Sequence, residues 1–161
     1  MYKSYLNNTT LPRGLRNNNP GNLIRTSIAW DGKVALYNNP DSKFEQFIEL
    51  RYGLRALMRD IISDFKDGSD TVRKLISEFA PAHENNTIAY INSVSQMLGI
   101  TADTQINNLT AVQLIAFCKA IVRVENGASF DSYITDADYS DAYAILGINL
   151  GTIVKKKKKL Y

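Results

Sequence analysis

GLRALMRDIISDF, residues 53–65, is the stretch that decides the fold. Its large apolar residues recur at steps of three and four, at Leu54, Leu57, Met58, Ile61, Ile62 and Phe65. This spacing places them on one face of an α-helix, and the Asp-Gly pair at 67–68 provides a stop just beyond it. The stretch therefore predicts a long amphipathic helix whose apolar face packs on a protein core.

Four further helices are expected towards the C-terminus. Their start signals are Asp70, then Asn85 or Asn86, and then Thr110, because these residue types accept hydrogen bonds from the first N–H groups of a helix. Proline or glycine at positions 81, 99 and 127 provides stops. The expected helices cover residues 71–79, 87–98, 111–127 and about 136–146.

The N-terminal part has a different pattern. LIR (23–25), KVALY (33–37) and KFEQF (43–47) are short, rich in β-branched or aromatic residues, and separated by turn-forming WDG and NNPDS. The predicted fold class is therefore α+β, mainly α, with a small antiparallel β-sheet near the N-terminus. We expect residues 1–11 to form an arm, 12–150 one domain and 151–161 a basic tail.

Composition narrows the possible partners. The chain has 161 residues and a net charge of +3, but five of its 19 basic residues form the run 155–159. Outside that run the 16 acidic residues outnumber the basic ones, so no basic face is left to track a nucleic acid. We expect no nucleic-acid partner and interpret the lysine run as a solvated tail. The alternative contacts of this run are an anionic wall polymer, an anionic lipid or DNA, and nucleic-acid binding is a third function class that depends on the run alone.

Metal and membrane sites are not expected either. The single cysteine, Cys118, lies in an apolar run and fits a buried core position. With one histidine, His83, and no metal-type spacing, the sequence predicts no metal and no cofactor. The N-terminus lacks the apolar segment of a secretion signal, and no apolar stretch is long enough to span a membrane.

Glu125 is the first candidate for a catalytic residue. It continues the apolar stripe of helix 111–127, on which Leu114, Cys118 and Ile121 precede it. A carboxyl group buried on such a stripe either finds a partner or retains its proton at neutral pH, and a retained proton can be given to a glycosidic oxygen. The alternative is that the helix end frays and Glu125 pairs with Arg123 or a tail lysine.

Other polar and aromatic residues complete the candidate site. Glu84 is the second choice of catalytic residue, although it can also serve the N-terminus of helix 87–98. RGLRNNNPGNLI (13–24) is expected to be an exposed bend whose amides suit sugar hydroxyls, and aromatic faces suit sugar rings. The candidate substrate-binding residues are Asn17, Asn18, Asn19, Asn22, Trp30, Tyr90 and Asn126.

The ordered set RGLRNNNPGNL, WDG, a short FxxF strand, GLRAL, FAPAHENNTIAYINSV and AIVRVENG resembles a family of phage and phage-derived proteins. That family comprises virion structural and peptidoglycan-degrading proteins. NNPGNLI followed by a hairpin is similar to a segment of cell-wall glucosaminidases, and ENNTIAYINSV is similar to a stretch of soluble lytic transglycosylases in which the tyrosine borders the groove. By that match Tyr90 is the groove residue, and the fold is expected to be lysozyme-like.

The order of the motifs differs from that of the enzymes it resembles. In those enzymes the catalytic glutamate ends an apolar helix that comes before the asparagine loop, whereas here no helix is expected before Asn17 and the comparable glutamate, Glu125, comes near the C-terminus. Asn126 also stands where the enzymes have serine. We therefore hypothesise a circular permutation, in which Glu125 faces the Asn17 to Asn22 loop and Tyr90.

The resemblance implies a bacteriolytic enzyme whose partner is peptidoglycan. Because Glu125 has no obvious second carboxylate, the favoured reaction is that of a lytic transglycosylase, between N-acetylmuramic acid and N-acetylglucosamine, with one glutamate as acid and base. A hydrolytic muramidase or glucosaminidase is the nearest alternative, and a non-catalytic virion or cell-wall-binding protein is the alternative of another class. The expected location is a phage virion, with other virion proteins as partners, or the host periplasm and cell wall.

Overall fold

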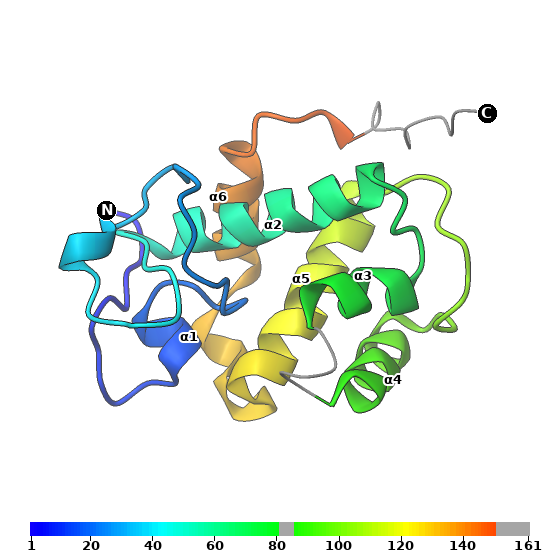
Figure 1. The fold of residues 1–161 in the computed structure, drawn as a ribbon, viewed down its shortest axis with the longest axis horizontal. Coiled ribbons are helices and arrows are strands. Elements are labelled where there is room, and N and C mark those ends of the chain that lie inside the picture. The colour runs from blue at the N-terminus through cyan, green and yellow to red at the C-terminus, as the bar shows by residue number, and fades with distance from the viewer. Residues whose placement is uncertain (81–85, 151–161) are drawn as a thin grey trace. The chain divides into compact units, whose positions relative to one another are not determined.

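The computed structural model describes residues 1–80 and 86–150. His83, Glu84 and the lysine tail lie outside the described residues. The elements are α1 (Arg13–Arg16), a 3-10 helix η1 (Leu36–Asn38), α2 (Leu50–Lys66), α3 (Val72–Phe79), α4 (Thr87–Leu98), α5 (Ala111–Asn126), a second 3-10 helix η2 (Ala128–Tyr133) and α6 (Asp136–Ala144) (Figure 1). The described part of the chain is therefore mainly helical, as the sequence predicts.

The chain divides into two compact units. Unit 1 comprises residues 1–59 and 121–147, and unit 2 comprises residues 60–120 and 148–161 as far as they are described. The divisions fall inside α2 and α5, so each of these long helices contributes residues to both units.

The apolar stripe of α2 is buried throughout, as its spacing predicts. In unit 1 Leu54, Leu57 and Met58 are fully buried, and in unit 2 Ile61, Ile62 and Phe65 are at most 3% exposed. Burying a side chain of this size contributes about 1.5–3 kcal/mol of hydrophobic free energy. The helix thereby supplies part of the core of each unit.

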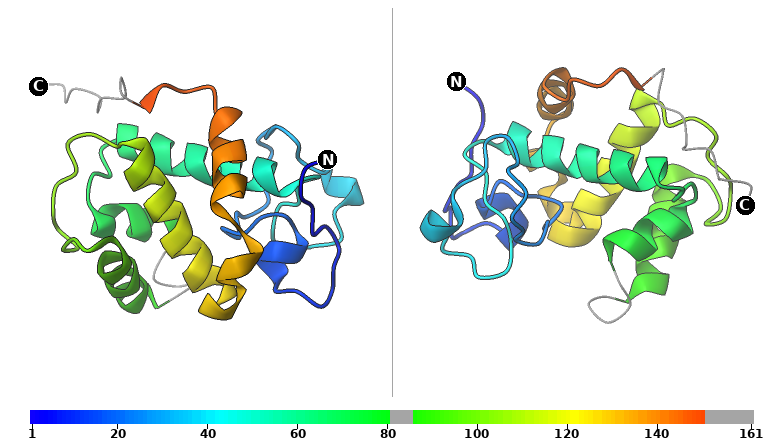
Figure 2. Two further views of the ribbon diagram at one scale, coloured as in Figure 1. Left: turned by 180° about the vertical axis from the view of Figure 1, so that it is seen from behind. Right: turned by 45° about the horizontal axis from the view of Figure 1, so that its top comes forward.

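Unit 2 contains α3 and α4, which lie side by side (Figures 1 and 2). Phe79 of α3 and Tyr90 of α4 make an edge contact, with ring centroids 6.4 Å apart. Thr71 caps α3 by accepting a hydrogen bond from the Lys74 N–H, so the expectation that Asp70 is this cap is wrong. Threonine fits the role because its hydroxyl reaches the N–H three residues on.

Both predicted ends of α4 and the predicted start of α5 are confirmed, whereas α2 begins three residues before Gly53 and α6 ends at Ala144, two residues earlier than expected. Asn86 caps α4 through the N–H of Ala89, and Gly99 ends that helix with φ +68°. Thr110 and Gln113 cap α5 reciprocally, each side chain accepting from the backbone N–H of the other. Thr135, which the sequence analysis did not single out, forms a capping box with Asp138 at the start of α6.

The prediction of a small antiparallel sheet is wrong. Within residues 1–80 and 86–150 the pairing consists of two isolated antiparallel bridges, Ile24 with Phe44 and Lys33 with Phe47. Leu36 and Tyr37, the last two residues of the expected second strand, lie in the 3-10 helix Leu36–Asn38 instead. The fold class of the described chain is helical, with irregular loops in place of strands.

Asparagine side chains explain why these loops do not become strands. The amide of Asn19 donates to the carbonyl oxygens of Leu23 and Glu45, and the amide of Asn18 donates to the carbonyl oxygen of Phe47, all at 2.9–3.0 Å. The carbonyl oxygen of Leu23 also accepts from the N–H of Glu45, at 3.0 Å, whereas those of Glu45 and Phe47 are acceptors that a neighbouring strand would otherwise use. Because side chains satisfy these two, residues 45–47 are held without a regular ladder.

The first residues are docked onto unit 1. Lys3 pairs with Asp138 at 2.6 Å, and the hydroxyl of Tyr5 donates to the carbonyl oxygen of Tyr133 at 2.7 Å. Leu11 is 7% exposed and belongs to the core. A one-turn helix, α1, follows and precedes Asn17, where the sequence analysis expected no helix.

Candidate functional site

Glu125 lies in the last turn of α5, in unit 1, and is half-buried. The helix ends there because Gly127 adopts φ +95°, a conformation that favours glycine, while its N–H still bonds to the carbonyl oxygen of Arg123. Arg123, the alternative partner of Glu125, forms an ion pair with Asp131. The carboxyl group thus stands where a rigid helix meets a loop.

Asn22 meets Glu125 from the asparagine-rich loop. Its Nδ2 donates a hydrogen bond of 3.3 Å to Oε1 of Glu125, across a separation of 103 residues. Asn22 has φ +51°, a left-handed conformation that asparagine adopts more readily than most residues, and its N–H bonds to the carbonyl oxygen of Asn19. The expectation that Glu125 faces this loop is confirmed at Asn22.

Asn126 fixes the end of α5 to the same loop. Its Nδ2 donates to the carbonyl oxygens of Pro20, at 2.8 Å, and Val122, at 2.9 Å. Gly14 of α1 packs directly against its side chain, and a Cβ at position 14 would overlap Oδ1 of Asn126 and crowd Oδ1 of Asn22. These two buried amide oxygens accept no hydrogen bond from the described residues. Polar acceptors therefore gather beside Glu125.

Asn17, Asn18 and Asn19 are buried, with at most 2% exposure, so the expectation of an exposed bend is wrong for them. The amides of Asn18 and Asn19 bond to carbonyl oxygens inside unit 1, as described above. Asn17 donates to Asp41 and accepts from Gln46, each at 2.9 Å. Their amides are thus committed within the protein, which leaves Asn22 and Asn126 at the candidate site.

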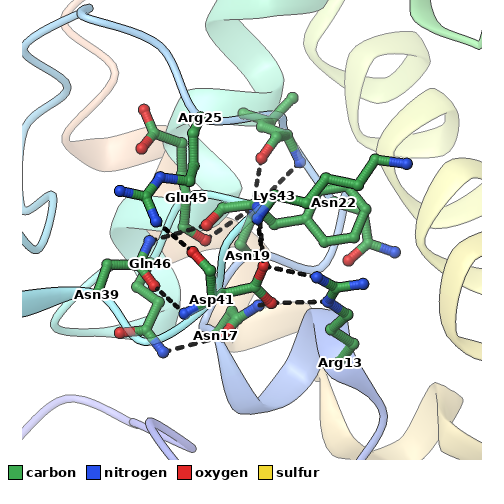
Figure 3. Close-up of polar contacts among 12 residues, drawn as sticks. Arg13, Asn17, Asn19, Asn22, Arg25, Asn39, Asp41, Lys43, Glu45 and Gln46 are labelled. Carbon is green, nitrogen blue, oxygen red and sulfur yellow. Dashed lines mark hydrogen bonds and ion pairs between the residues drawn. The ribbon is translucent and has the colours of Figure 1, made fainter. Parts of the chain in front are cut away.

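Asp41 organises a second polar cluster in unit 1. Arg13 and Asn17 both point towards its carboxylate (Figure 3), and Arg13 donates two hydrogen bonds of 2.7 Å to it. The Arg13 guanidinium holds the pKa of Asp41 well below its usual range, and the N–H groups of Phe44 and Lys43 and the amide of Asn17 add to this against the effect of burial. Asp41 is therefore a charged structural anchor.

Glu45 is a buried acid that the sequence analysis did not single out. Its side chain is fully buried and pairs with Lys33, with Nζ 2.9 Å from Oε2. The other carboxyl oxygen, Oε1, accepts no hydrogen bond from the described residues. The signal that could have revealed this burial is spacing, because Glu45 precedes the buried Phe47 by two positions in an extended segment.

Trp30, Tyr90 and Glu84 are the remaining candidate residues. Trp30 is half-buried in unit 1, and its carbonyl oxygen accepts from the N–H of Lys33. Tyr90 belongs to unit 2, is 4% exposed and packs on Phe79. Glu84 lies outside the described residues. Sugar contacts by Trp30 and Tyr90 stay predictions.

Among residues 1–80 and 86–150, no group of three or more histidine, cysteine or acidic side chains could hold a metal ion. In that same part of the chain no helix combines the length and the apolar character needed to cross a membrane. Cys118 is buried, which confirms its predicted core position.

Comparison with known proteins identifies a relative but no family model that matches. An alignment of 126 residues shows 35% identity to Protein P5 of Pseudoalteromonas phage PM2, covering 75% of this chain and 75% of the relative. The chain belongs to the Protein P5 family. The relationship to bacteriophage proteins that the motifs predict is thereby confirmed.

Proposed function

We propose that the chain cleaves the glycan strands of bacterial peptidoglycan between N-acetylmuramic acid and N-acetylglucosamine. The acid and base is Glu125, and the reaction is that of a lytic transglycosylase. The observation that carries the proposal is the hydrogen bond from Asn22 to Glu125, because it joins the two sequence features on which the resemblance to cell-wall enzymes depends. A phage relative is consistent with such an activity.

The environment of Glu125 suits a group that alternates between acid and base. It is half-buried on a rigid helix end, which limits its motion and its hydration. The Asn22 amide can donate to a carboxylate through Nδ2 and, after turning, accept from a carboxylic acid through Oδ1. Asn22 therefore acts as a positioning residue in both states.

The proposed reaction needs one carboxyl group and no added water. Neutral Glu125 gives its proton to the glycosidic oxygen, the bond from that oxygen to C1 of the muramic acid breaks, and positive charge develops at C1. The 6-hydroxyl of the same sugar then attacks C1 and gives its proton to the Glu125 carboxylate. A 1,6-anhydro product forms and the acid is restored.

Digestion of purified peptidoglycan tests the proposal. Wild type is expected to release anhydro-muropeptides, detected by mass spectrometry, whereas Glu125→Gln is expected to release about a thousandth as much or less, as expected for loss of the acid. Glu78→Gln, an exposed acid on α3, is the matched control and should retain activity. Circular dichroism of all three confirms that they are folded.

The products also distinguish the alternatives. Reducing-end sugars in place of anhydro sugars would replace the transglycosylase reaction by hydrolysis. Equal release by wild type and Glu125→Gln would remove Glu125 from the mechanism. Retention of the protein on peptidoglycan with no release of fragments would identify a binding protein and overturn the enzymatic proposal.

A further inference from the structure

A pocket of about 450 Å³ opens in unit 1 beside the Asp41 cluster. Its lining includes Arg13, Arg16 and Asn17 from the first helix and the residue that follows it. Thr9 and Ser42 also belong to the lining. The pocket is thus an open hollow whose lining includes two arginines, and it is large enough for a small ligand group.

The charges of the lining do not cancel. Arg13 and Asp41 neutralise each other through two hydrogen bonds of 2.7 Å. Arg16 is half-buried and, within residues 1–80 and 86–150, its guanidinium forms no hydrogen bond or ion pair. The positively charged guanidinium of Arg16 is therefore left in the pocket without a negatively charged partner.

The wall around Arg16 is already ordered. The carbonyl oxygen of Arg16 accepts from the N–H of Asn7 at 2.7 Å, which ties the preceding loop to α1. The amide of Gln46 donates to the side chains of both Asn7 and Asn17, at 3.0 and 2.9 Å. The hydroxyl groups of Thr9 and Ser42 are donors of the same pocket. The backbone beside Arg16 is thus held in place, and the exposed hydroxyl groups of Thr9 and Ser42 can donate to a ligand in the pocket.

We propose that this pocket binds a peptide carboxylate, with the Arg16 guanidinium as its principal partner. A carboxylate matches the planar fork of arginine and can also accept from the neighbouring hydroxyl groups. The inference rests on the proposed function for the source of that carboxylate, which is a peptide stem of the peptidoglycan. The pocket would then recognise the peptide, while Glu125 acts on the glycan.

Binding can be measured without any cleavage. The ¹⁵N-labelled full chain is titrated with N-acetyl-D-alanyl-D-alanine and, separately, with its C-terminal amide, which lacks the carboxylate. We expect the acid to shift the backbone signals of Asn7, Thr9 and Ser42 and the amide to leave them unchanged. Arg16→Gln should weaken binding of the acid at least tenfold, as expected for loss of a charge-assisted hydrogen bond.

Controls separate this inference from others. Arg73→Gln, which changes an exposed arginine of unit 2, should bind like wild type. Arg16→Lys keeps the charge without the fork and should bind with intermediate affinity. Binding of inorganic phosphate without binding of the peptide acid would overturn the assignment of a peptide ligand. Equal binding of the acid and its amide would overturn the assignment of a carboxylate.

The outcome is independent of the activity assay. Loss of peptide binding in Arg16→Gln with glycan cleavage retained supports the pocket. Absence of peptide binding in a wild type that cleaves glycan overturns the pocket alone. Peptide binding by a wild type that does not cleave glycan overturns the proposed function and leaves the pocket supported.

Discussion

Gly53 of α2 lies directly against the backbone carbonyl of Asn18, so closely that a Cβ at position 53 would overlap the carbonyl oxygen. The side chain of Asn18 is itself fully buried and bonded to the carbonyl oxygen of Phe47 at 2.9 Å. Neither the helix nor the loop can move aside without breaking buried contacts. The glycine in the deciding stretch is therefore a close-approach residue.

Gly53→Ala is expected to destabilise the protein by about 3 kcal/mol or more, because overpacking against fixed backbone outweighs the gain in helix propensity. At an unobstructed helix position the same change would stabilise by about 0.5–1 kcal/mol. Urea unfolding monitored by circular dichroism measures the difference. Ser63→Ala, on an exposed position of α2, is the control and should change stability by less than about 0.5 kcal/mol. A neutral or stabilising Gly53→Ala would contradict the close approach.

Asn22→Gly tests the positioning of Glu125, because glycine tolerates the left-handed backbone at this position but lacks the amide. We expect glycan cleavage to fall about tenfold, as for loss of one hydrogen bond to a charged group. In Asn22→Asp we expect the rate of glycan cleavage to fall further. The pH profile of cleavage should also shift upwards, because a second carboxylate disfavours ionisation of Glu125. An unshifted profile in Asn22→Asp would speak against direct contact.

Asp41→Asn is expected to destabilise the protein by about 2 kcal/mol at pH 7, because it removes the charged partner of the half-exposed Arg13 and weakens hydrogen bonds to a side chain that is only 6% exposed. Because the pKa of Asp41 is lowered in the folded protein, its carboxylate contributes to the free energy of unfolding at pH values above its unfolded-state pKa, which is near 4. That contribution is lost as the pH falls through the folded-state pKa. Denaturant unfolding should therefore show a smaller difference between wild type and variant at pH 3 than at pH 7. A constant difference would contradict the charge-based account.

Asp64→Asn should have the opposite effect. Burial, together with Asp60, Glu78 and Asp67 nearby, raises the pKa of Asp64 to about 6. Because this pKa is raised in the folded protein, the contribution of Asp64 to stability is fully present below its unfolded-state pKa, near 4, and is lost as the pH rises through 6. The variant should gain about 1 kcal/mol at pH 7, after allowance for solvent screening, and nothing at pH 4. Thermal unfolding at both values checks this, and an equal gain at both would contradict it.

The helices could be predicted from the sequence because their signals are local. The apolar stripe in residues 53–65 repeats at every turn of its own helix. The caps Asn86 and Thr110 and the stop at Gly99 each lie within one turn of the helix end that they mark. Asp70 was misassigned because Thr71, one position later, has the same capping chemistry. Adjacent residues of equal capping propensity cannot be ranked without the geometry of the helix.

The sheet could not be rejected from the sequence. Residues 33–37 and 43–47 have strand-like composition, and what prevents a ladder is the side chains of Asn18 and Asn19, which come much earlier in the chain. Composition reports the preference of a segment, and tertiary contacts decide its partners. The same limit applies to the site, where the position of Glu125 on the apolar stripe was visible but its partner, Asn22, is 103 residues away.

The buried asparagines also bear on the order in which the protein folds. Asn17, Asn18 and Asn19 bond to Gln46, Phe47 and Glu45, which lie 26 to 29 positions further along the chain. Such contacts require closure of a long loop, which costs entropy before any bond is formed, whereas the turns of α2 form between near neighbours. The loop that positions Asn22 should therefore be assembled late in folding, after the helix against which it closes.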